Sequence, residues 1–276
     1  MDDCDLIYSN NPFYEDILAG LYFQKKKTGD KRKIIFNILD LAPHLGDQFP
    51  LEKLKKNLEY CDAVTCISKT VEKDCLERLK IKTFTIYNPI MDVYRDRPVT
   101  KVSFDRKFKY LLSGRLLDPN KRAGLAINAL RALNVDQNEV AFCGTEYPGF
   151  GVNLGVVSEE QLREIYQNVD YVLMTSHHEG LGLQVPEAMA AGAIPVVCND
   201  LSTKWEFLPS EIFPEYDDVY PNTHCIVRFI DKYNKDLKAL NKLKEKIYYY
   251  YDDNLSYQFS EEGVAKAIEK VYNQLQ

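Results

Sequence analysis

A glycine-rich turn between two short apolar runs places the strongest constraint on the fold of this sequence. The runs Val169–Met174 and Ile194–Cys198 have the length and composition of buried strands. Between them, Ser176–Gly192 combines glycines with a helix-forming stretch of small residues. Glycines let a backbone approach a ligand closely, and the first turn of a helix presents free N–H groups to an anion. The segment therefore predicts an anion-binding turn at the end of a strand.

Two carboxylates, Glu179 and Glu187, bracket this turn. A carboxylate near a phosphate-binding turn can accept hydrogen bonds from sugar hydroxyls. Each acid also has an ordinary interpretation, because the positive end of a helix favours acidic residues in its first turn. The two side chains need not share a face, so they are expected to contact different ends of one ligand.

The bulk properties exclude several classes of protein. A chain of 276 residues is long enough for two domains, and 45% hydrophobic with 28% charged residues is typical of a globular protein. A net charge of −6 argues against a general nucleic-acid binder. No apolar run is long enough to span a bilayer, and the acidic start Met1–Asp5 does not fit a signal peptide. We therefore expect a cytoplasmic protein, with peripheral membrane contact left open.

The seven cysteines are scattered and include no CxxC pair or Cys/His cluster. This pattern indicates neither a zinc site nor a disulfide framework, and favours reduced, buried thiols.

The first part of the chain alternates strand and helix patterns. Predicted strands cover residues 5–9, 33–39, 63–68 and 83–87, with helices near 13–23, 51–60 and 70–79. This order predicts a parallel sheet with crossover helices. A polar segment over 92–107 is interpreted as a linker.

A second series of alternating elements follows the linker. Predicted strands cover residues 108–112, 139–144, 169–174 and 194–198, with a short strand or loop at 153–157; helices cover 124–133, 158–168, 232–250 and 260–275. Residues 201–220 are expected to be irregular. The sequence thus predicts an α/β protein with two Rossmann-type β/α/β domains.

A basic segment, Lys25–Lys33, follows the first predicted helix. We favour a solvated loop. The alternative is contact with an anionic membrane surface or an acidic acceptor.

In doubly wound folds, ligands bind beyond the carboxyl ends of the strands. The loop after the strand 108–112 contributes Gly114, Arg115 and Lys121 there, and the loop after Met174 contributes the glycine-rich turn. Two cations beside a helix N-terminus are suited to a diphosphate.

These motifs together resemble those of retaining GT-B glycosyltransferases, most closely glycosyltransferase family 4. Glu179–Leu183 followed by Glu187 resembles the family's E-x7-E signature, and Ser113-Gly114-Arg115 with Lys121 resembles its cationic diphosphate pair. Leu154–Val157 resembles the segment before that signature. The resemblance implies a GT-B-like fold with two domains facing a cleft. It implies domains at 1–97 and 98–257, with a C-terminal helix, 258–276, returning to the first.

The resemblance also implies a role for each matching residue. Arg115 and Lys121 would neutralise the donor diphosphate, Glu179 would hold hydroxyls of the donor sugar, and Glu187 would hold the ribose. The remaining donor-binding positions line the same site: Gly114, Val156, Val157, His178, Gly180, Leu181, Gly182 and Leu183. Val156 or Val157 would lie near the base. No cofactor or metal is implied.

Two features depart from the family pattern. Position 181 is Leu where the family usually has Phe. The resemblance also implies an initial strand and Gly-rich loop before the part that matches Asp5 onward, and without them the N-terminal domain is expected to be short. His44 is a candidate for a histidine that the family often carries after its second matching strand, and a surface loop histidine is an equal interpretation. His177 and His178 either line the cleft or pack the loop.

The expected function is retaining transfer of a sugar from a nucleotide-diphospho-sugar, UDP- or GDP-linked, to a hydroxyl acceptor. The acceptor would be a glycan, a lipid-linked molecule or another hydroxyl compound. The alternative is a non-catalytic nucleotide-sugar-binding protein or a glycosyltransferase subunit that needs a partner, which the short first domain motivates. The sequence also leaves open whether the chain forms a homo-oligomer.

Overall fold

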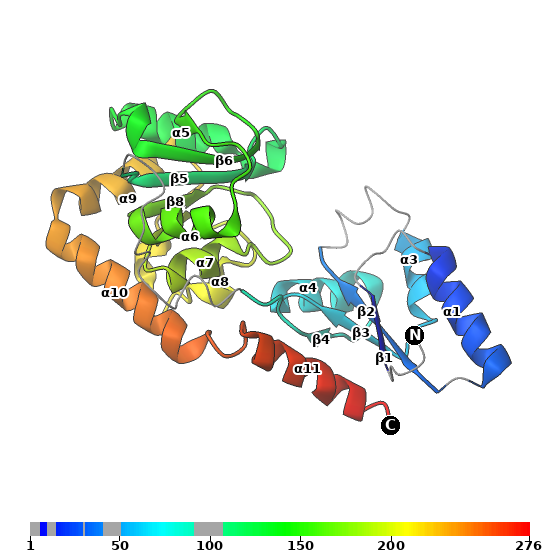
Figure 1. Cartoon of the computed structure of the whole chain (residues 1–276). Coiled ribbons are helices and arrows are strands. Elements are labelled where there is room, and N and C mark those ends of the chain that lie inside the picture. The colour runs from blue at the N-terminus through cyan, green and yellow to red at the C-terminus, as the bar shows by residue number, and fades with distance from the viewer. Residues whose placement is uncertain (1–5, 10–14, 30, 41–50, 91–106) are drawn as a thin grey trace. The chain divides into compact units, whose positions relative to one another are not determined.

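The chain divides into two compact units with separate parallel sheets. The structure, a computed structural model, describes residues 6–9, 15–29, 31–40, 51–90 and 107–276. Unit 1 comprises Met1–Pro89 with Glu261–Gln276, and unit 2 comprises Ile90–Ser260 (Figure 1). The predicted linker lies almost entirely outside the described residues.

Unit 1 carries a four-stranded sheet in the order β1-β2-β3-β4. Its elements are β1 (Leu6–Ser9), α1 (Glu15–Thr28), β2 (Lys33–Ile38), α3 (Leu51–Leu58), β3 (Ala63–Cys66), α4 (Lys69–Asp74) with a π-helical continuation over Cys75–Leu79, and β4 (Phe84–Thr85). All strand pairs are parallel, as the alternating pattern predicts.

The last helix of the chain, α11 (Glu261–Asn273), packs on the sheet of unit 1. Its Val271 joins a buried cluster with Ile35, Ala63 and Ile86. Ile268 and Val264 lie one and two turns earlier on the same face, which is the spacing of an amphipathic helix. The apolar face of α11 thus closes a sheet formed by the first residues of the chain.

The basic segment Lys25–Lys33 begins inside a helix, and its described residues 29 and 31–32 form the predicted loop that leads into β2. α1 continues to Thr28, so Lys25–Lys27 form its last turn, where cations offset the negative end of the helix dipole. Lys25 pairs with Asp62 at 2.8 Å, and the Nζ of Lys26 lies over the Tyr22 ring. The high helix propensity of lysine and these contacts together explain why α1 extends to Thr28. Membrane contact by this segment stays a prediction.

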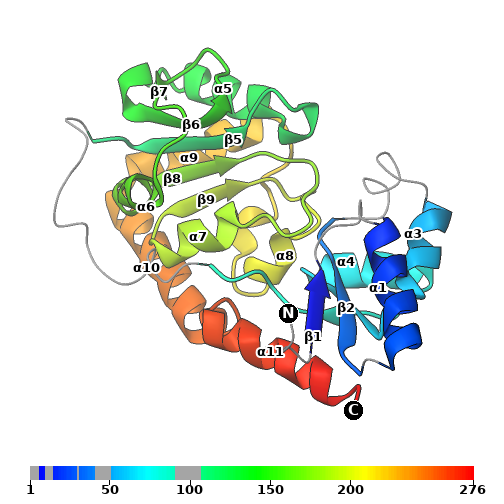
Figure 2. The ribbon, with the colours of Figure 1, turned by 45° about the vertical axis from the view of Figure 1, so that its right-hand side comes forward.

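Unit 2 carries a five-stranded parallel sheet in the order β7-β6-β5-β8-β9. Its strands are β5 (Tyr110–Arg115), β6 (Val140–Glu146), β7 (Val152–Asn153), β8 (Tyr171–Met174) and β9 (Ile194–Val197), and its helices are α5 (Ala123–Ala132), α6 (Glu159–Asn168), α7 (Gln184–Ala190), α8 (Lys204–Phe207), α9 (Thr223–Lys235) and α10 (Leu237–Asn254). Figure 2 shows α9 on the opposite side of this sheet from α7.

Two expectations for the end of unit 2 were wrong. The single helix predicted over 232–250 is two helices, because the side chain of Asp236 accepts hydrogen bonds from the N–H groups of Lys238 and Ala239 and starts α10 there. Residues 201–220 are not wholly irregular, since they include α8 and a 3₁₀ turn over Pro214–Tyr216.

Stacked tyrosines anchor the centre of the unit 2 sheet. Tyr110 of β5 and Tyr171 of β8 face each other in register, with ring centroids 5.4 Å apart. Asn234 of α9 links their hydroxyls: its Nδ2 donates to Tyr110 and its Oδ1 accepts from Tyr171. Satisfying both buried hydroxyls ties α9 to the two central strands.

Lys204 of α8 is fully buried, which the sequence did not indicate. Its Nζ donates to the Tyr216 carbonyl at 3.1 Å and lies over the Trp205 ring. Burial lowers the pKa of Lys204 to about 8, against the opposing charges of Asp217 and Asp200. An ammonium group without a carboxylate contact is expensive in a protein interior.

Replacing Lys204 by Met changes how stability depends on pH. Below pH 8 the lysine is charged in both the folded and unfolded states, so the burial cost is fully present. As pH rises toward 10 the folded state releases the proton first, and the wild type gains roughly 2–3 kcal/mol relative to Lys204→Met. Urea unfolding at pH 7 and 10 measures this difference. A wild-type advantage that stays constant between the two pH values, as expected for the exposed Lys242→Met control, would contradict it.

Candidate functional site

The topology of unit 2 brings two loops together at one edge of the sheet. β5 lies between β6 and β8, so the chain leaves β5 toward one side of the sheet and leaves β8 toward the other. In open α/β sheets, ligands bind at such a reversal of strand order, beyond the carboxyl ends of the strands. The loops after β5 and β8 carry the predicted cations and the predicted carboxylate respectively.

The loop after β5 is a tight turn that presents Lys121. A 3₁₀ turn spans Pro119–Lys121, and the Asp118 carboxylate caps it by accepting a hydrogen bond from Asn120 N–H at 2.9 Å. Proline presets the backbone angle for the turn, and aspartate supplies the cap. These two residues explain why the side chain of Lys121 starts from a fixed position in the loop.

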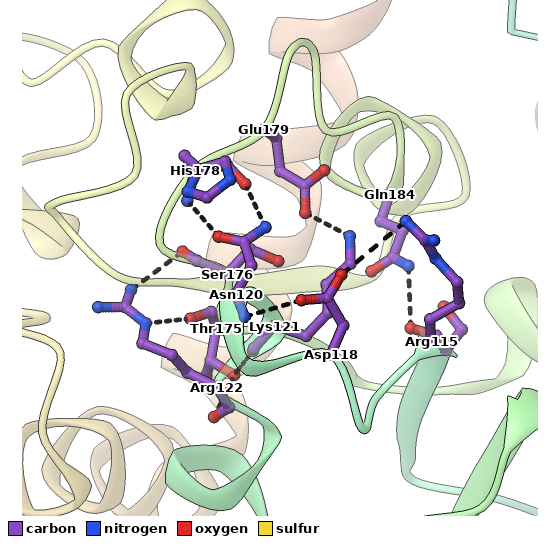
Figure 3. A network of polar contacts seen from close by, with 11 residues as sticks. Arg115, Asp118, Asn120, Lys121, Arg122, Thr175, Ser176, His178, Glu179 and Gln184 are labelled. Carbon is purple, nitrogen blue, oxygen red and sulfur yellow. Dashed lines mark hydrogen bonds and ion pairs between the residues drawn. The ribbon is translucent and has the colours of Figure 1, made fainter. Parts of the chain in front are cut away.

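Lys121 meets Glu179 across this loop pair. The Lys121 Nζ donates to Glu179 Oε1 at 2.5 Å, and the side chains are only 20% and 18% exposed (Figure 3). The residues are 58 positions apart in the sequence. The structure therefore brings together two of the residues that the sequence singled out.

Arg115 ends β5 and reaches solvent. Its side chain is 73% exposed, with one guanidinium nitrogen 3.9 Å from Asp118. A guanidinium this exposed retains donors for an anion. Arg115 thus places a second positive charge on the β5 loop that carries Lys121.

Two glycines, Gly114 and Gly144, let the ends of β5 and β6 lie close together at this edge. The φ of Gly114, +103°, lies in a region that favours glycine. A Cβ added to Gly144, at the equivalent end of β6, would lie 2.2 Å from the Gly114 carbonyl oxygen. The Gln184 side chain donates to the neighbouring Ser113 carbonyl at 3.1 Å and links the start of α7 to β5.

A tyrosine of α6 binds the side chain of Glu187. The hydroxyl of the buried Tyr166 donates to Glu187 Oε2 at 2.8 Å. Burial raises the pKa of Glu187, and the Tyr166 hydrogen bond opposes that rise. Glu187 is therefore a half-buried acceptor with one oxygen engaged.

The remaining predicted donor residues lie on the loops around this pair. Leu181 is 3% exposed and Gly180 is buried, so a ligand would meet this stretch mainly through its backbone. Gly182 has a φ of +75° that favours glycine, and Leu183 directly precedes α7. Val156 is 78% exposed, and Val157 is half-buried beside it.

The histidine predictions have different outcomes. His44 lies outside the described residues. His178 is half-buried, and its backbone carbonyl accepts a hydrogen bond from Asn120 Nδ2 at 2.9 Å. Within the described part of the chain, no three His, Cys, Asp or Glu side chains gather where they could hold a metal ion. Independence from metal stays a prediction.

Three polar residues that sequence reasoning missed complete the network. Asn120 and Arg122 flank Lys121, and both bind the β8 loop. Asp200 follows β9 and binds Arg122. The available signal was position alone: each lies beyond the carboxyl end of a strand.

Comparisons with known proteins identify the fold. Residues 152–208 match the family model described as Glycosyl transferases group 1, a segment that includes Glu179 and Glu187. A search of curated protein sequences finds no match.

Three solved structures resemble the whole chain. Sucrose-phosphate synthase from Thermosynechococcus elongatus superposes with a TM-score of 0.71 at 17% identity, over 98% of this chain and 73% of that one. A glycosyltransferase from Rickettsia africae gives 0.68 at 17% identity, over 96% and 82%. The N-terminal domain of trehalose-6-phosphate phosphatase from Candida albicans gives 0.68 at 12% identity, over 97% and 70%.

The chain has a GT-B-like fold. This confirms the α/β class with Rossmann-like domains. The family match supports glycosyl transfer as the general activity, within EC class 2.4. No helix among the described residues combines the length and apolar character needed to cross a membrane.

Replacing Tyr166 by Phe raises the pKa of Glu187 further. The lost hydrogen bond stabilises the ionised carboxylate, so its removal favours the protonated acid. A ¹³C NMR titration of the glutamate carboxyl groups measures the change. Tyr147→Phe, which removes an exposed hydroxyl bound to the Gly151 carbonyl, is the control and leaves the titration unchanged. An unaltered or lowered pKa in Tyr166→Phe would contradict the contact.

Proposed function

We propose that this protein is a retaining glycosyltransferase that moves a sugar from a nucleotide-diphospho-sugar to an acceptor hydroxyl. The observation that carries the proposal is the contact of Lys121 with Glu179 at the point where the strand order reverses. Glu179 lies within the segment that matches the glycosyltransferase family. A cation and a sugar-binding acid at one point suit a molecule that joins a diphosphate to a sugar.

The proposed reaction needs little covalent chemistry from the protein. The bond between the sugar's anomeric carbon and the diphosphate breaks, and negative charge develops on the leaving oxygen. Lys121 and the exposed Arg115 would stabilise that charge. The acceptor hydroxyl then attacks the anomeric carbon from the same face and passes its proton to the departed diphosphate oxygen, so the configuration is retained. The proposed donor would release UDP or GDP.

The ion pair leaves Lys121 able to bind phosphate. An ammonium group has three donors, and the contact with Glu179 uses one of them. A phosphate oxygen can therefore join Lys121 while Glu179 turns its other oxygen toward sugar hydroxyls. Glu187, with one oxygen on Tyr166, keeps the other for the ribose.

A panel of nucleotide sugars tests the proposal. UDP-, GDP-, ADP- and TDP-sugars are first screened by thermal shift, where a true donor raises the melting temperature as its concentration exceeds Kd. The best donor is then followed by NMR for transfer and for the configuration of the product. Retained configuration and turnover that persists in EDTA are expected. Binding without hydrolysis or transfer to any acceptor would favour the non-catalytic or partner-dependent alternative.

Charge removal at the proposed diphosphate site weakens donor binding. Arg115→Gln is the first variant, because this side chain is exposed and we expect its replacement to leave folding unchanged. We expect a fall in donor affinity of roughly 10-fold, the usual effect of losing a hydrogen bond to a charged group. Lys121→Met is expected to lose at least as much. Isothermal titration with the donor measures both.

Two matched controls accompany these variants. Arg131→Gln removes an exposed arginine of α5, and Lys242→Met an exposed lysine of α10. Both controls should bind donor as the wild type does. Unchanged affinity in Arg115→Gln and Lys121→Met together would overturn the site assignment.

A further inference from the structure

Asn120 binds the backbone of the β8 loop at three points. Its Nδ2 donates to the His178 carbonyl at 2.9 Å, and its Oδ1 accepts from the His178 N–H at 3.1 Å. Its own carbonyl accepts from the His177 N–H at 2.9 Å. A side-chain amide that satisfies both the donor and the acceptor of one residue fixes that residue's position and orientation.

Arg122 binds the two residues before these. Its Nε donates to the Thr175 carbonyl at 2.8 Å and its Nη2 to the Ser176 carbonyl at 3.0 Å. The Thr175 hydroxyl donates back to the Lys121 and Arg122 carbonyls, at 3.0 and 3.1 Å. Thr175, Ser176 and His178 are therefore tied to the turn that carries Lys121 (Figure 3). His177 is tied to the same turn through its N–H.

Asp200 completes the arrangement from the loop after β9. It accepts two hydrogen bonds from the Arg122 guanidinium, at 2.7 and 2.9 Å, and lies 3.2 Å from His177 Nδ1. Burial opposes ionisation here, but the bonds from Arg122 and His177 outweigh it and lower the pKa of Asp200. A two-point pair with a guanidinium restricts rotation as well as distance.

The backbone of Arg122 is held in a strained conformation. Its φ of +46° lies in the left-handed region, which non-glycine residues rarely adopt. Surrounding contacts must impose such a conformation, and strain of this kind gathers at functional sites. In this conformation the Arg122 guanidinium binds two carbonyls and one carboxylate.

We propose that Asn120, Arg122 and Asp200 form a loop clamp that positions Glu179 against Lys121 and thereby sets the recognition of the donor sugar. The inference rests on the proposed function. Glu179 directly follows the four clamped residues, whereas Lys121 sits within the turn that carries the clamp. Loss of the clamp therefore displaces the sugar-binding acid more than the diphosphate-binding cation. The clamp residues are positioning residues, since they bind backbone and each other.

The test compares sugar-dependent and diphosphate-dependent behaviour in Arg122→Lys and Asn120→Ala. Arg131→Lys and Asn138→Ala are matched controls on exposed positions of the same unit. We expect kcat with the donor to fall about 10- to 100-fold in both clamp variants, as for a small misplacement of a reacting group. Affinity for UDP or GDP alone should change less than about twofold, because Lys121 stays in place.

Amide hydrogen exchange rates, measured by NMR, test whether the clamp holds the β8 loop without relying on activity. In Asn120→Ala the His178 N–H loses its acceptor and should exchange faster. The change in exchange rate should be smaller at residues far from the loop. Asp200→Asn, an isosteric change, should loosen Arg122 and give a smaller fall in kcat. Thermal melting identifies any variant that fails to fold.

Two results would overturn the proposal. Equal losses in kcat and in nucleoside diphosphate affinity would mean that Arg122 or Asn120 contacts the donor itself. Unchanged kcat and unchanged exchange in both variants would mean that they position nothing. Absence of donor binding and turnover in the wild type would instead refute the proposed function, while the exchange rates would still decide whether the clamp holds the loop.

Discussion

The ion pair between Lys121 and Glu179 is the contact on which the site in unit 2 depends. Its side chains are about four-fifths shielded from water, so each charge has lost part of its hydration. Two such groups remain together only if the backbone fixes them, since the desolvation cost offsets much of the attraction. The surrounding loops supply that constraint through hydrogen bonds.

The parallel sheet explains why these loops are adjacent. β5 and β8 are separated by two strands and two helices in the sequence but are paired in the sheet. The stacked Tyr110 and Tyr171 fix this pairing at one end of the strands. The carboxyl ends of β5 and β8 therefore lie side by side, and the loops that follow place Lys121 and Glu179 in contact. Strand order, rather than any single motif, makes the chemistry possible.

The sequence predicted the alternating elements well because buried parallel strands are short apolar runs bounded by turn residues. It also predicted Lys121 and Glu179, whose spacing from strand ends indicates the same edge of a sheet. It did not predict the loop clamp. Asn120, Arg122 and Asp200 are ordinary surface residue types, and their contacts depend on turn geometry that periodicity does not describe. The burial of Lys204 was not predicted for a similar reason, since it depends on contacts that form only in the folded chain.

The central claim is that Lys121 and Glu179 flank the diphosphate and the sugar of one donor. A crystal structure of the full chain with a non-transferable analogue of the donor found by the screen tests it most directly. The account predicts diphosphate oxygens within about 3 Å of Lys121 Nζ and sugar hydroxyls on Glu179. An analogue bound elsewhere in the chain, with the Lys121–Glu179 contact untouched by it, would contradict the account.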